Sequence, residues 1–325
     1  MRTRRLSTLV VAIATAAALV ACGGQRESDT GAGAQGGRLT IATGNTTGVY
    51  YQLGGALASL ISSKIDGYRA TASETGASVQ NIQGLVAKNY DIAFSLGDTA
   101  ADAVNGTNSF DKPQDVVALT RLYPNYTQVA VRASSGITKI ADLKGKRVST
   151  GSPNSGTEVI ARRLLTAAGL DPAKDVTAQR LALPESVDAM KSGTIDALVW
   201  SGGLPTSGIT DLTTSLGKDA RLIPLTDVLP AMQQEYGDVY SEAAIPAATY
   251  KQPADVATIA VPNVLLVRKD MADELAEKLT KLIYENTDAL IQVNAAAKAI
   301  KPEDASKTDP VPLHPGAMKA LDSFG

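Results

Sequence analysis

The stretch that decides the fold is "RLTIATGNTTGVYYQLGGALASLISSKI", residues 38–65. Its first six residues form a short apolar run typical of a buried strand, and a polar turn from Gly44 to Gly48 follows. Apolar residues then recur at helical spacing, at Leu53, Leu57, Leu60, Ile61 and Ile65. The sequence therefore predicts a strand, a turn and a helix, in that order.

The same order recurs along the chain. The segments "YRATAS", "DIAFSLG", "LKGKRVST" and "TIDALVW" read as strands. The segments "DTAADAVNG", which ends at Gly106, and "SGTEVIARRLLTAAGL" read as helices. Near the C-terminus an extended segment, "ATIAVPNVLLVRKD", precedes one long amphipathic helix, "MADELAEKLTKLIYENTDALIQVN". Strands that alternate with helices predict an α/β fold, with open, mostly parallel or mixed sheets covered by helices on both faces.

The pattern predicts two lobes. We expect residues 38–128 and 262–325 to form lobe I, and residues 129–261 to form lobe II. The chain would then cross twice between the lobes, near 126–131 and 261–267, and these crossings would act as a hinge. Ligands of open α/β sheets bind beyond the carboxyl ends of the strands, so the turns after strands should supply a site in the cleft.

The N-terminus reads as an export signal. Residues 1–21 combine three Arg with an apolar run and small residues, as in a secretory signal peptide. The ending "LVAC" resembles a bacterial lipobox, which implies cleavage before Cys22 and a lipid, such as palmitate, on the protein. The alternative is an ordinary secreted protein with one stray thiol. Residues 22–37 are Gly-rich and predict a flexible tether, so we expect an extracytoplasmic protein anchored to the membrane by lipid.

Composition excludes several classes of function. A net charge of -2 and 4% aromatic residues argue against a nucleic-acid partner. With one His and one Cys, a His- or Cys-based zinc cluster is not possible. The chain has no P-loop and no G-x-S-x-G elbow, and His314 between prolines reads as structural. We therefore expect no catalytic residues, no metal and no cofactor, although the many carboxylates leave a two-carboxylate glycosidase open by counting alone.

Four turns share a small, polar composition. They are "TGNTTGVYY" from Thr43, "SETGASVQN" from Ser73, "TGSPNSGTEVI" from Thr150 and "WSGGLPTSG" from Trp200. A helix start offers unpaired N–H groups and partial positive charge to an anion, and Gly lets the backbone approach it. Each turn taken alone also has a structural interpretation, since Ser155-x-x-Glu158 is a capping box. Together the turns predict a binding site for a small anion.

Some polar and aromatic residues near these turns remain ambiguous. Trp200, with Tyr50 and Tyr51, suits a pocket wall but also a core or surface position. Asp98 follows a strand and is suited either to a ligand ammonium group or to a helix cap. Arg121 could meet a carboxylate but also suits a strand edge.

An ordered set of motifs resembles one family over residues 38–325. The motifs are "IATGNTTGVYYQLGGALA", "TASETGASVQNIQGL", "LKGKRVSTGSPNSGT", "DALVWSGGLPTSGITDL", "VPNVLLVRKDM" and "PLHPGA". They resemble the TRAP-associated extracytoplasmic immunogenic (TAXI) family, the solute receptors of tripartite ATP-independent periplasmic transporters. The resemblance implies a two-lobed, type II periplasmic-binding-protein fold and a TRAP membrane permease as partner. It also implies a glutamate-like, glutamine-like or dicarboxylate ligand.

The resemblance also implies a set of site residues. They are Gly44, Thr46, Tyr50, Tyr51, Thr75, Gly76, Ser78, Asn81, Ser152, Ser155, Gly156, Thr157, Trp200, Gly203 and Pro205. The chain departs from the family at "SLGD", where Leu96 and Gly97 replace a more polar strand end. We expect a receptor that captures a small carboxylate or amino acid without altering it. The alternatives are the binding protein of an ATP-driven importer, an extracytoplasmic ligand sensor, or an enzyme on the same fold.

Overall fold

Two long antiparallel strands form the centre of the structure. The computed structural model describes residues 36–324, in which β4 (Val116–Arg132) pairs with β10 (Val256–Arg268). Both strands are buried almost along their whole length. They lie in the middle of one ten-stranded mixed sheet, in the order β2-β1-β3-β10-β4-β7-β5-β6. The predicted α/β class is confirmed.

The first half of the molecule lies on the β10 side of this pair. Its strands are β1 (Gly37–Ala42), β2 (Tyr68–Ser73) and β3 (Ile92–Leu96), and β1 runs parallel to both of the others. Its helices are α1 (Val49–Lys64), α2 (Ser78–Val86), α3 (Gly97–Asn105), α9 (Asp273–Glu285), α10 (Thr287–Val293) and α11 (Pro315–Leu321). The single C-terminal helix predicted from sequence is two helices, α9 and α10, which meet at Asn286.

The second half lies on the β4 side. Its strands are β5 (Arg147–Ser149), β6 (Thr177–Gln179) and β7 (Ala197–Gly202), with β5 parallel to both others, while β8 (Ala220–Leu222) pairs with β4 and β9 (Ser241–Ile245) with β10. Its helices are α4 (Gly156–Ala167), α5 (Leu183–Ser192), α6 (Ser207–Leu216), α7 (Leu229–Tyr236) and α8 (Ala247–Tyr250). Short 3-10 turns complete the described chain at η1 (Ala133–Ser135), η2 (Ile140–Leu143), η3 (Gly217–Asp219), η4 (Ala295–Ala299) and η5 (Pro302–Asp304).

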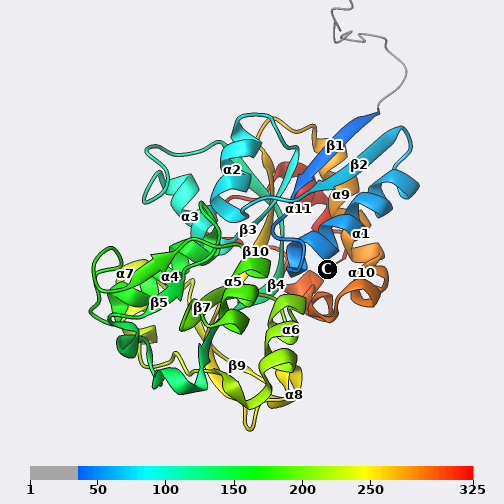
Figure 1. Ribbon diagram of the computed structural model, residues 1–325. Helices are drawn as coiled ribbons and strands as arrows, with labels where there is room; N and C mark the ends of the chain where they lie inside the picture. The colour runs from blue at the N-terminus through cyan, green and yellow to red at the C-terminus, as the bar shows by residue number, and fades with distance from the viewer. Residues whose placement is uncertain (1–35, 325) are drawn as a thin grey trace, which may run out of the picture. The chain divides into compact units, whose positions relative to one another are not determined.

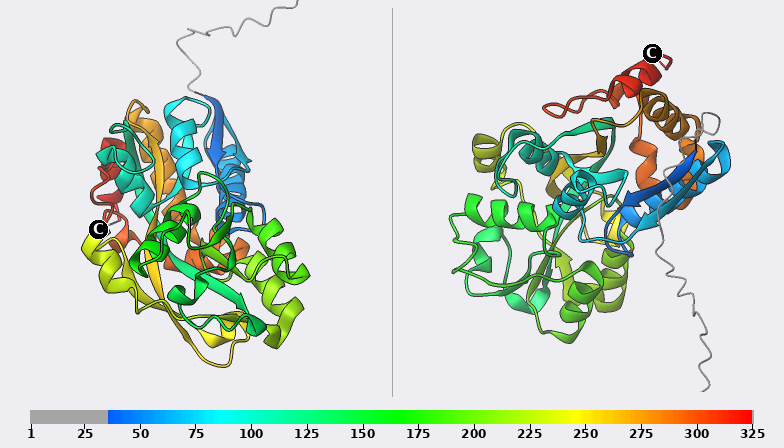
Figure 2. Two further views of the ribbon diagram at one scale, coloured as in Figure 1. Left: turned by 60° about the vertical axis from the view of Figure 1, so that its left-hand side comes forward. Right: turned by 90° about the horizontal axis from the view of Figure 1, so that it is seen from above.

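Helices lie on both faces of the sheet in each half, and the C-terminal helices return to the first half (Figure 1). Both views of Figure 2 show the yellow to orange strand β10, which pairs with β4, running from one half into the other. The sheets of the two halves are therefore continuous through these strands. The segments "DVVALTRLY" and "TQVAVRA", which the sequence pattern would divide into two strands, lie in the single strand β4.

The two halves connect at a pair of prolines. Pro124 of β4 faces Pro262 of β10, and the register shifts between Pro262 and Val264. Neither proline has a backbone N–H to donate, so the ladder is weakest at this point. This is where a hinge between halves would bend at least cost. Residues from 36 on form one compact unit, so the boundaries predicted at 128 and 261 stay predictions.

The predicted signal peptide, the lipidated Cys22 and most of the tether lie outside the described residues and stay predictions. The first strand begins at Gly37, inside the segment predicted as tether. Among residues 36–324, no helix is both long enough and apolar enough to cross a bilayer.

Candidate functional site

A cavity lies between the halves, at the carboxyl ends of β1, β2, β3, β5 and β7. Four segments at or just after strand ends supply most of its lining, near positions 44–50, 76–78, 152–157 and 200–203. Its volume is about 30 Å³, room for roughly two water molecules. The lining residues are Gly44, Asn45, Gly48, Val49, Tyr50, Gly76, Ala77, Ser78, Leu96, Tyr123, Asn125, Ser152, Ser155, Gly156, Thr157, Trp200, Ser201, Gly202 and Gly203. We call this the central cavity.

The turn after β1 joins the two halves through Asn45. Its Nδ2 lies 3.2 Å from the Oγ of Ser152, and its Oδ1 accepts a hydrogen bond of 2.9 Å from the amide of Leu183. Asn45 itself is buried, and both partners belong to the second half. Sequence analysis missed this residue, although it sits in the turn quoted first, because its partners are far along the chain. The halves are thus in direct contact beside the cavity.

The turn after β5 starts helix α4 at the cavity. Ser155 is the N-cap and accepts a 3.0 Å hydrogen bond from the amide of Glu158, so the predicted capping role is confirmed. The Glu158 carboxylate accepts from the amide of Asn154 at 2.8 Å, which fixes the loop. A Cβ at Gly156 would lie 2.5 Å from Leu96 Cδ1, so only Gly allows this helix to approach the first half so closely. Ser155 therefore both caps helix α4 and lines the cavity.

The turn after β2 starts helix α2 on the opposite side. Gly76 and Ser78 line the cavity, and the Ser78 hydroxyl accepts a 3.0 Å hydrogen bond from the amide of Leu96. Two neighbouring residues predicted for the site build the turn instead. Thr75 donates to Asn81 Oδ1 at 2.6 Å, and Asn81 Nδ2 donates to the carbonyls of Thr43 and Phe94 at 2.7 and 2.8 Å.

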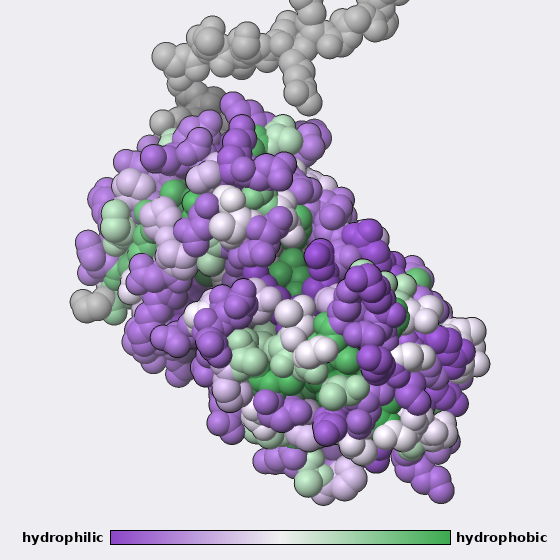
Figure 3. All heavy atoms as spheres, turned by 90° about the vertical axis from the view of Figure 1, so that its left-hand side faces the viewer, coloured by the Kyte–Doolittle hydropathy of each residue, from purple (hydrophilic) through white to green (hydrophobic). Residues whose placement is uncertain are grey.

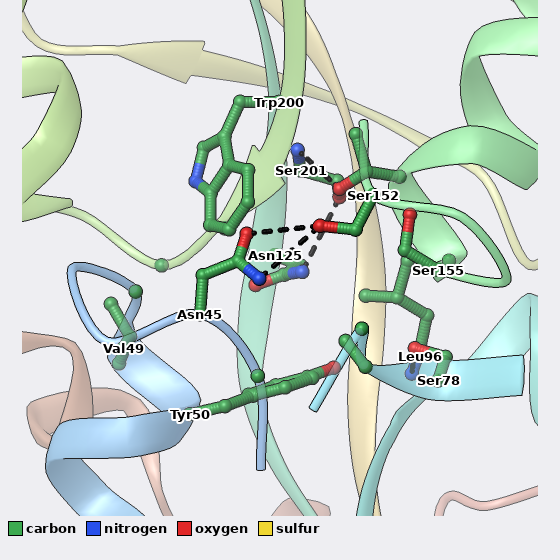
Figure 4. Close-up of a pocket in the computed structure, with 18 of the residues that line it drawn as sticks. Asn45, Val49, Tyr50, Ser78, Leu96, Asn125, Ser152, Ser155, Trp200 and Ser201 are labelled. Carbon is green, nitrogen blue, oxygen red and sulfur yellow. Dashed lines mark hydrogen bonds between the residues drawn. The ribbon is translucent and has the colours of Figure 1, made fainter. Parts of the chain in front are cut away.

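Two aromatic side chains stand on opposite sides of the cavity, Trp200 above and Tyr50 below in the view of Figure 4. The indole Nε1 of Trp200 donates to Thr206 Oγ1 at 3.1 Å, and the ring packs against Gly48, where a Cβ would lie 3.3 Å from Cζ2. The Tyr50 hydroxyl donates to Asn263 Oδ1 at 2.5 Å. Asn45 and Ser152 lie between the two rings, joined by dashed lines (Figure 4).

The central strands add polar residues that sequence analysis missed. Tyr123 and Asn125 of β4 line the cavity, and Asn263 of β10 donates to the carbonyl of Tyr123 at 2.8 Å and to Asn125 Oδ1 at 3.1 Å. The Tyr123 side chain is fully buried, and its hydroxyl has no hydrogen-bond partner in the described part of the chain. Burial raises the pKa of the Tyr123 and Tyr50 hydroxyls well above the ordinary value, so both stay protonated.

The structure gathers most of the predicted site residues around the cavity. Those that line it are Gly44, Tyr50, Gly76, Ser78, Ser152, Ser155, Gly156, Thr157, Trp200 and Gly203. Those that do not line it are Thr46, Tyr51, Thr75, Asn81, Asp98 and Pro205. That the gathered residues hold a ligand remains a prediction.

Asp98 and Arg121 lie elsewhere, on an open groove of about 1240 Å³ beside α3 and α7. The molecule narrows between its halves on this side, where the surface is mostly hydrophilic (Figure 3). Asp98 is fully buried and accepts from Arg163 Nη1 at 3.3 Å and from the Tyr240 hydroxyl at 2.5 Å. Its carboxylate is therefore used within the protein, and the predicted pairing with a ligand ammonium group does not fit this position.

Two further ionisable groups, His314 and Asp196, have structural partners. His314 is buried and caps α11, since its Nδ1 accepts from the amide of Gly316 at 3.1 Å. Asp196 forms an ion pair with Arg147 at 2.6 Å. Within residues 36–324, no group of three metal-ligating side chains is close enough to hold a metal ion.

The arrangement of the chain matches binding proteins of known structure. A binding protein component of an ABC phosphonate transporter from Pseudomonas aeruginosa is 14% identical with a TM-score of 0.55, covering 81% of this chain and 80% of the other. PhnD1 from Prochlorococcus marinus, in complex with methylphosphonate, is 12% identical with a TM-score of 0.52, covering 81% and 91%. A protein from Bordetella bronchiseptica RB50 is 21% identical with a TM-score of 0.55, covering 89% of each chain. The predicted periplasmic-binding-protein fold is confirmed.

The family expected from the sequence motifs is wrong. The model that matches residues 41–325 is that of the NMT1-like family, not of the TAXI receptors. The similar binding protein from Pseudomonas aeruginosa belongs to an ABC transporter, not to a TRAP system. The TRAP permease expected as partner is withdrawn with the family. The family model covers most of the sequence, and the chain belongs to the NMT1-like family.

Proposed function

We propose that the protein is an extracytoplasmic solute-binding protein that captures a small anion in the central cavity and delivers it to an ATP-driven importer. The fold is that of binding proteins, and the similar structure from Pseudomonas aeruginosa is a binding protein component of an ABC transporter. We therefore assign binding and no catalysis.

The observation that supports an anionic ligand is that three helices begin at one cavity. Helices α1, α2 and α4 begin there, at Val49, Ser78 and Gly156. The first N–H groups of a helix have no acceptor inside the helix, and each start carries partial positive charge. No lining residue is charged, so nothing in the lining cancels this potential. The unpartnered Tyr123 hydroxyl adds a buried donor.

Capture would need the halves to separate. In the present arrangement a hydrogen bond between Asn45 and Ser152 bridges the halves, and the cavity is too small to admit most solutes. Bending at Pro124 and Pro262, where the ladder is weakest, would open the cleft. Closure then removes water from the anion, so each hydrogen bond to it is made in an apolar setting and gains strength.

The test begins with protein that has been unfolded and refolded to remove any solute carried through purification. Thermal unfolding is then followed with short carboxylates, alkylphosphonates and alkylsulfonates, with the matching uncharged amides as controls. A binding anion raises the melting temperature with its concentration, whereas its amide does not. A panel in which no anion raises the melting temperature, or in which amides act equally, refutes the proposal.

The transport partner needs a separate test. Reading frames beside the gene are first searched for a permease and an ATPase. That pair is reconstituted in vesicles with the labelled anion and the binding protein outside. We expect uptake that requires ATP inside the vesicles and the binding protein outside. Uptake driven by an ion gradient without ATP contradicts the importer assignment and leaves the binding site untouched.

A further inference from the structure

The hydroxyl groups around the central cavity are arranged as donors. Ser155 Oγ accepts from the amide of Glu158, and Thr157 Oγ1 accepts from the amide of Ser201 at 3.2 Å. Ser201 Oγ in turn accepts from Asn125 Nδ2 at 3.3 Å. A hydroxyl has a single hydrogen to donate, and in each of these bonds the oxygen is the acceptor, so the hydrogen stays available. Three O–H groups are thus left to donate to a ligand.

Tyr123 adds the independent observation that this donor set faces a ligand. Tyr123 lines the cavity, and its hydroxyl is fully buried and has no partner among the described residues. A buried hydroxyl without a partner costs free energy, so such groups are rare in native proteins. A ligand oxygen would satisfy it. The helix starts at Ser78 and Gly156 support the same conclusion, since their amides are donors as well.

Strong acceptors for a cation are scarce in the same lining. No carboxylate lines the cavity, and Asp98 is held by Arg163 and Tyr240. The side-chain oxygens of both lining asparagines accept hydrogen bonds within the protein, Asn45 Oδ1 from the amide of Leu183 and Asn125 Oδ1 from Asn263. An ammonium group moved from water into this cavity would lose its hydration without gaining a counter-charge, which is strongly unfavourable.

The rest of the wall is apolar. Leu96 and Val49 line the cavity together with the indole face of Trp200. The small volume leaves little room between the donors for a second charged end of the ligand. The lining therefore suits one oxyanion group with a short hydrocarbon body.

We infer that the solute is a small monoanionic organic acid without an ammonium group, and that α-amino acids are excluded. Its oxyanion would accept from Tyr123, Ser155, Thr157 and the starts of α2 and α4, and its body would contact Leu96 and Trp200. This inference rests on the proposed function and narrows its ligand. It replaces the glutamate-like and glutamine-like ligands expected from the sequence motifs.

The experiment compares pairs of ligands that differ by the amino group alone. The refolded protein is titrated calorimetrically with propanoate against alanine and with butanoate against 2-aminobutanoate, and glutarate tests a second carboxylate. We expect each acid to bind at least about tenfold more tightly than its amino acid, because of the unpaired ammonium. Amino acids that bind equally or more tightly overturn the inference but leave the binding function intact. If neither acids nor amino acids bind, this inference fails, and the anion panel with alkylphosphonates and alkylsulfonates decides the proposed function.

A variant reverses the expected preference. Ser201→Asp places a carboxylate in the lining, and we expect it to weaken binding of the acids and to admit the matching amino acids. Ser201→Ala is the control, which should weaken the acids modestly and admit nothing new. A folded Ser201→Asp protein that still prefers the acids contradicts the inference. If this variant does not fold, the wild-type comparison of ligand pairs decides alone.

Discussion

Arg163 Nη2 lies 2.6 Å from Asp102 Oδ2, and this ion pair joins helix α4 of the second half to helix α3 of the first. The same guanidinium reaches Asp98 Oδ2 at 3.3 Å and the Tyr240 hydroxyl at 2.9 Å, with its side chain only 6% exposed. Burial lowers the pKa of Arg163, but Asp98, Tyr240 and Asp102 outweigh burial and raise it above its usual value. The two halves are therefore joined by a buried charged contact away from the central cavity.

Removing this contact should destabilise the fold strongly. Arg163→Met leaves the carboxylates of Asp98 and Asp102 buried without their cation, and we expect a loss of about 3–5 kcal/mol in the free energy of unfolding. Urea denaturation measures it. Arg147→Met, which breaks the more exposed pair with Asp196, is the matched control and should cost clearly less, because solvent screens this pair. Equal losses in both variants contradict the structural role given to Arg163.

The contact beside the cavity should act on closure rather than on folding. Asn45→Ala removes the hydrogen bonds to Ser152 and to the amide of Leu183, which bridge the halves. We expect weaker anion binding, by about 1–3 kcal/mol, and a larger radius of gyration in X-ray scattering without ligand. Asn89→Ala, at an exposed position, should change neither. An unchanged radius together with unchanged affinity rules out a role for Asn45 in closure.

Two tyrosines in the lining should respond in opposite ways. Tyr123→Phe removes a hydroxyl that has no partner, so the free protein should keep or gain stability, by up to about 1–3 kcal/mol, while anion affinity falls. Tyr50→Phe removes the donor to Asn263, so it should lose stability in the free protein. Urea denaturation and calorimetry on both variants separate these effects. A Tyr123→Phe protein that is less stable and binds normally would show that this hydroxyl serves the fold.

Local sequence signals predicted the parts of the site that come from turns. Ser152 to Thr157 and Gly76 to Ser78 stand where a strand ends and a helix begins, and such junctions show in the sequence as small polar residues before an apolar period. The alternation of strands and helices predicted the α/β fold for the same reason. The junctions between these strands and helices are set by neighbouring residues, so they can be predicted from a single sequence.

The rest of the candidate site depends on contacts between residues that lie far apart in the sequence. Tyr123 and Asn125 lie inside β4, where nothing local separates a cavity residue from any strand residue, and only the pairing with Asn263 places them. Asp98 closely follows a strand, as a ligand residue would, yet its partner Arg163 is 65 positions away. Asn45 and Ser152 are 107 positions apart. Neither the composition nor the periodicity of the sequence predicts which of these distant residues come into contact.

A surface contact near the C-terminus should make stability depend on acid pH. Hydrogen bonds from Lys281 and Lys319 lower the pKa of Glu277 to about 2, from an ordinary value of 4.5. A carboxylate with a lowered pKa in the folded state stabilises the protein above pH 4.5, and that contribution is lost as pH falls towards 2.

The variant Glu277→Gln tests this dependence. The difference in unfolding free energy between wild type and variant should shrink as pH falls through this window, because protonated Glu277 resembles Gln. Glu285→Gln is the control in the same helix, since the described residues give Glu285 no ion pair, and it should show no such trend. A constant difference between wild type and Glu277→Gln at every pH would remove the link between this carboxylate and α11.

The close approach of α4 to the first half can be tested with one methyl group. In Gly156→Ala the new Cβ would lie 2.5 Å from Leu96 Cδ1 and 2.7 Å from Ser78 Oγ, so the helix start must retreat from the cavity. We expect a loss of about 1–3 kcal/mol in stability and a clear loss of anion affinity, because the amides of α4 no longer reach the ligand. Gly55→Ala in α1, where a Cβ meets nothing within 4 Å, should instead gain up to about 1 kcal/mol and bind normally. If Gly156→Ala binds the anion as tightly as wild type, the start of α4 is not part of the binding site.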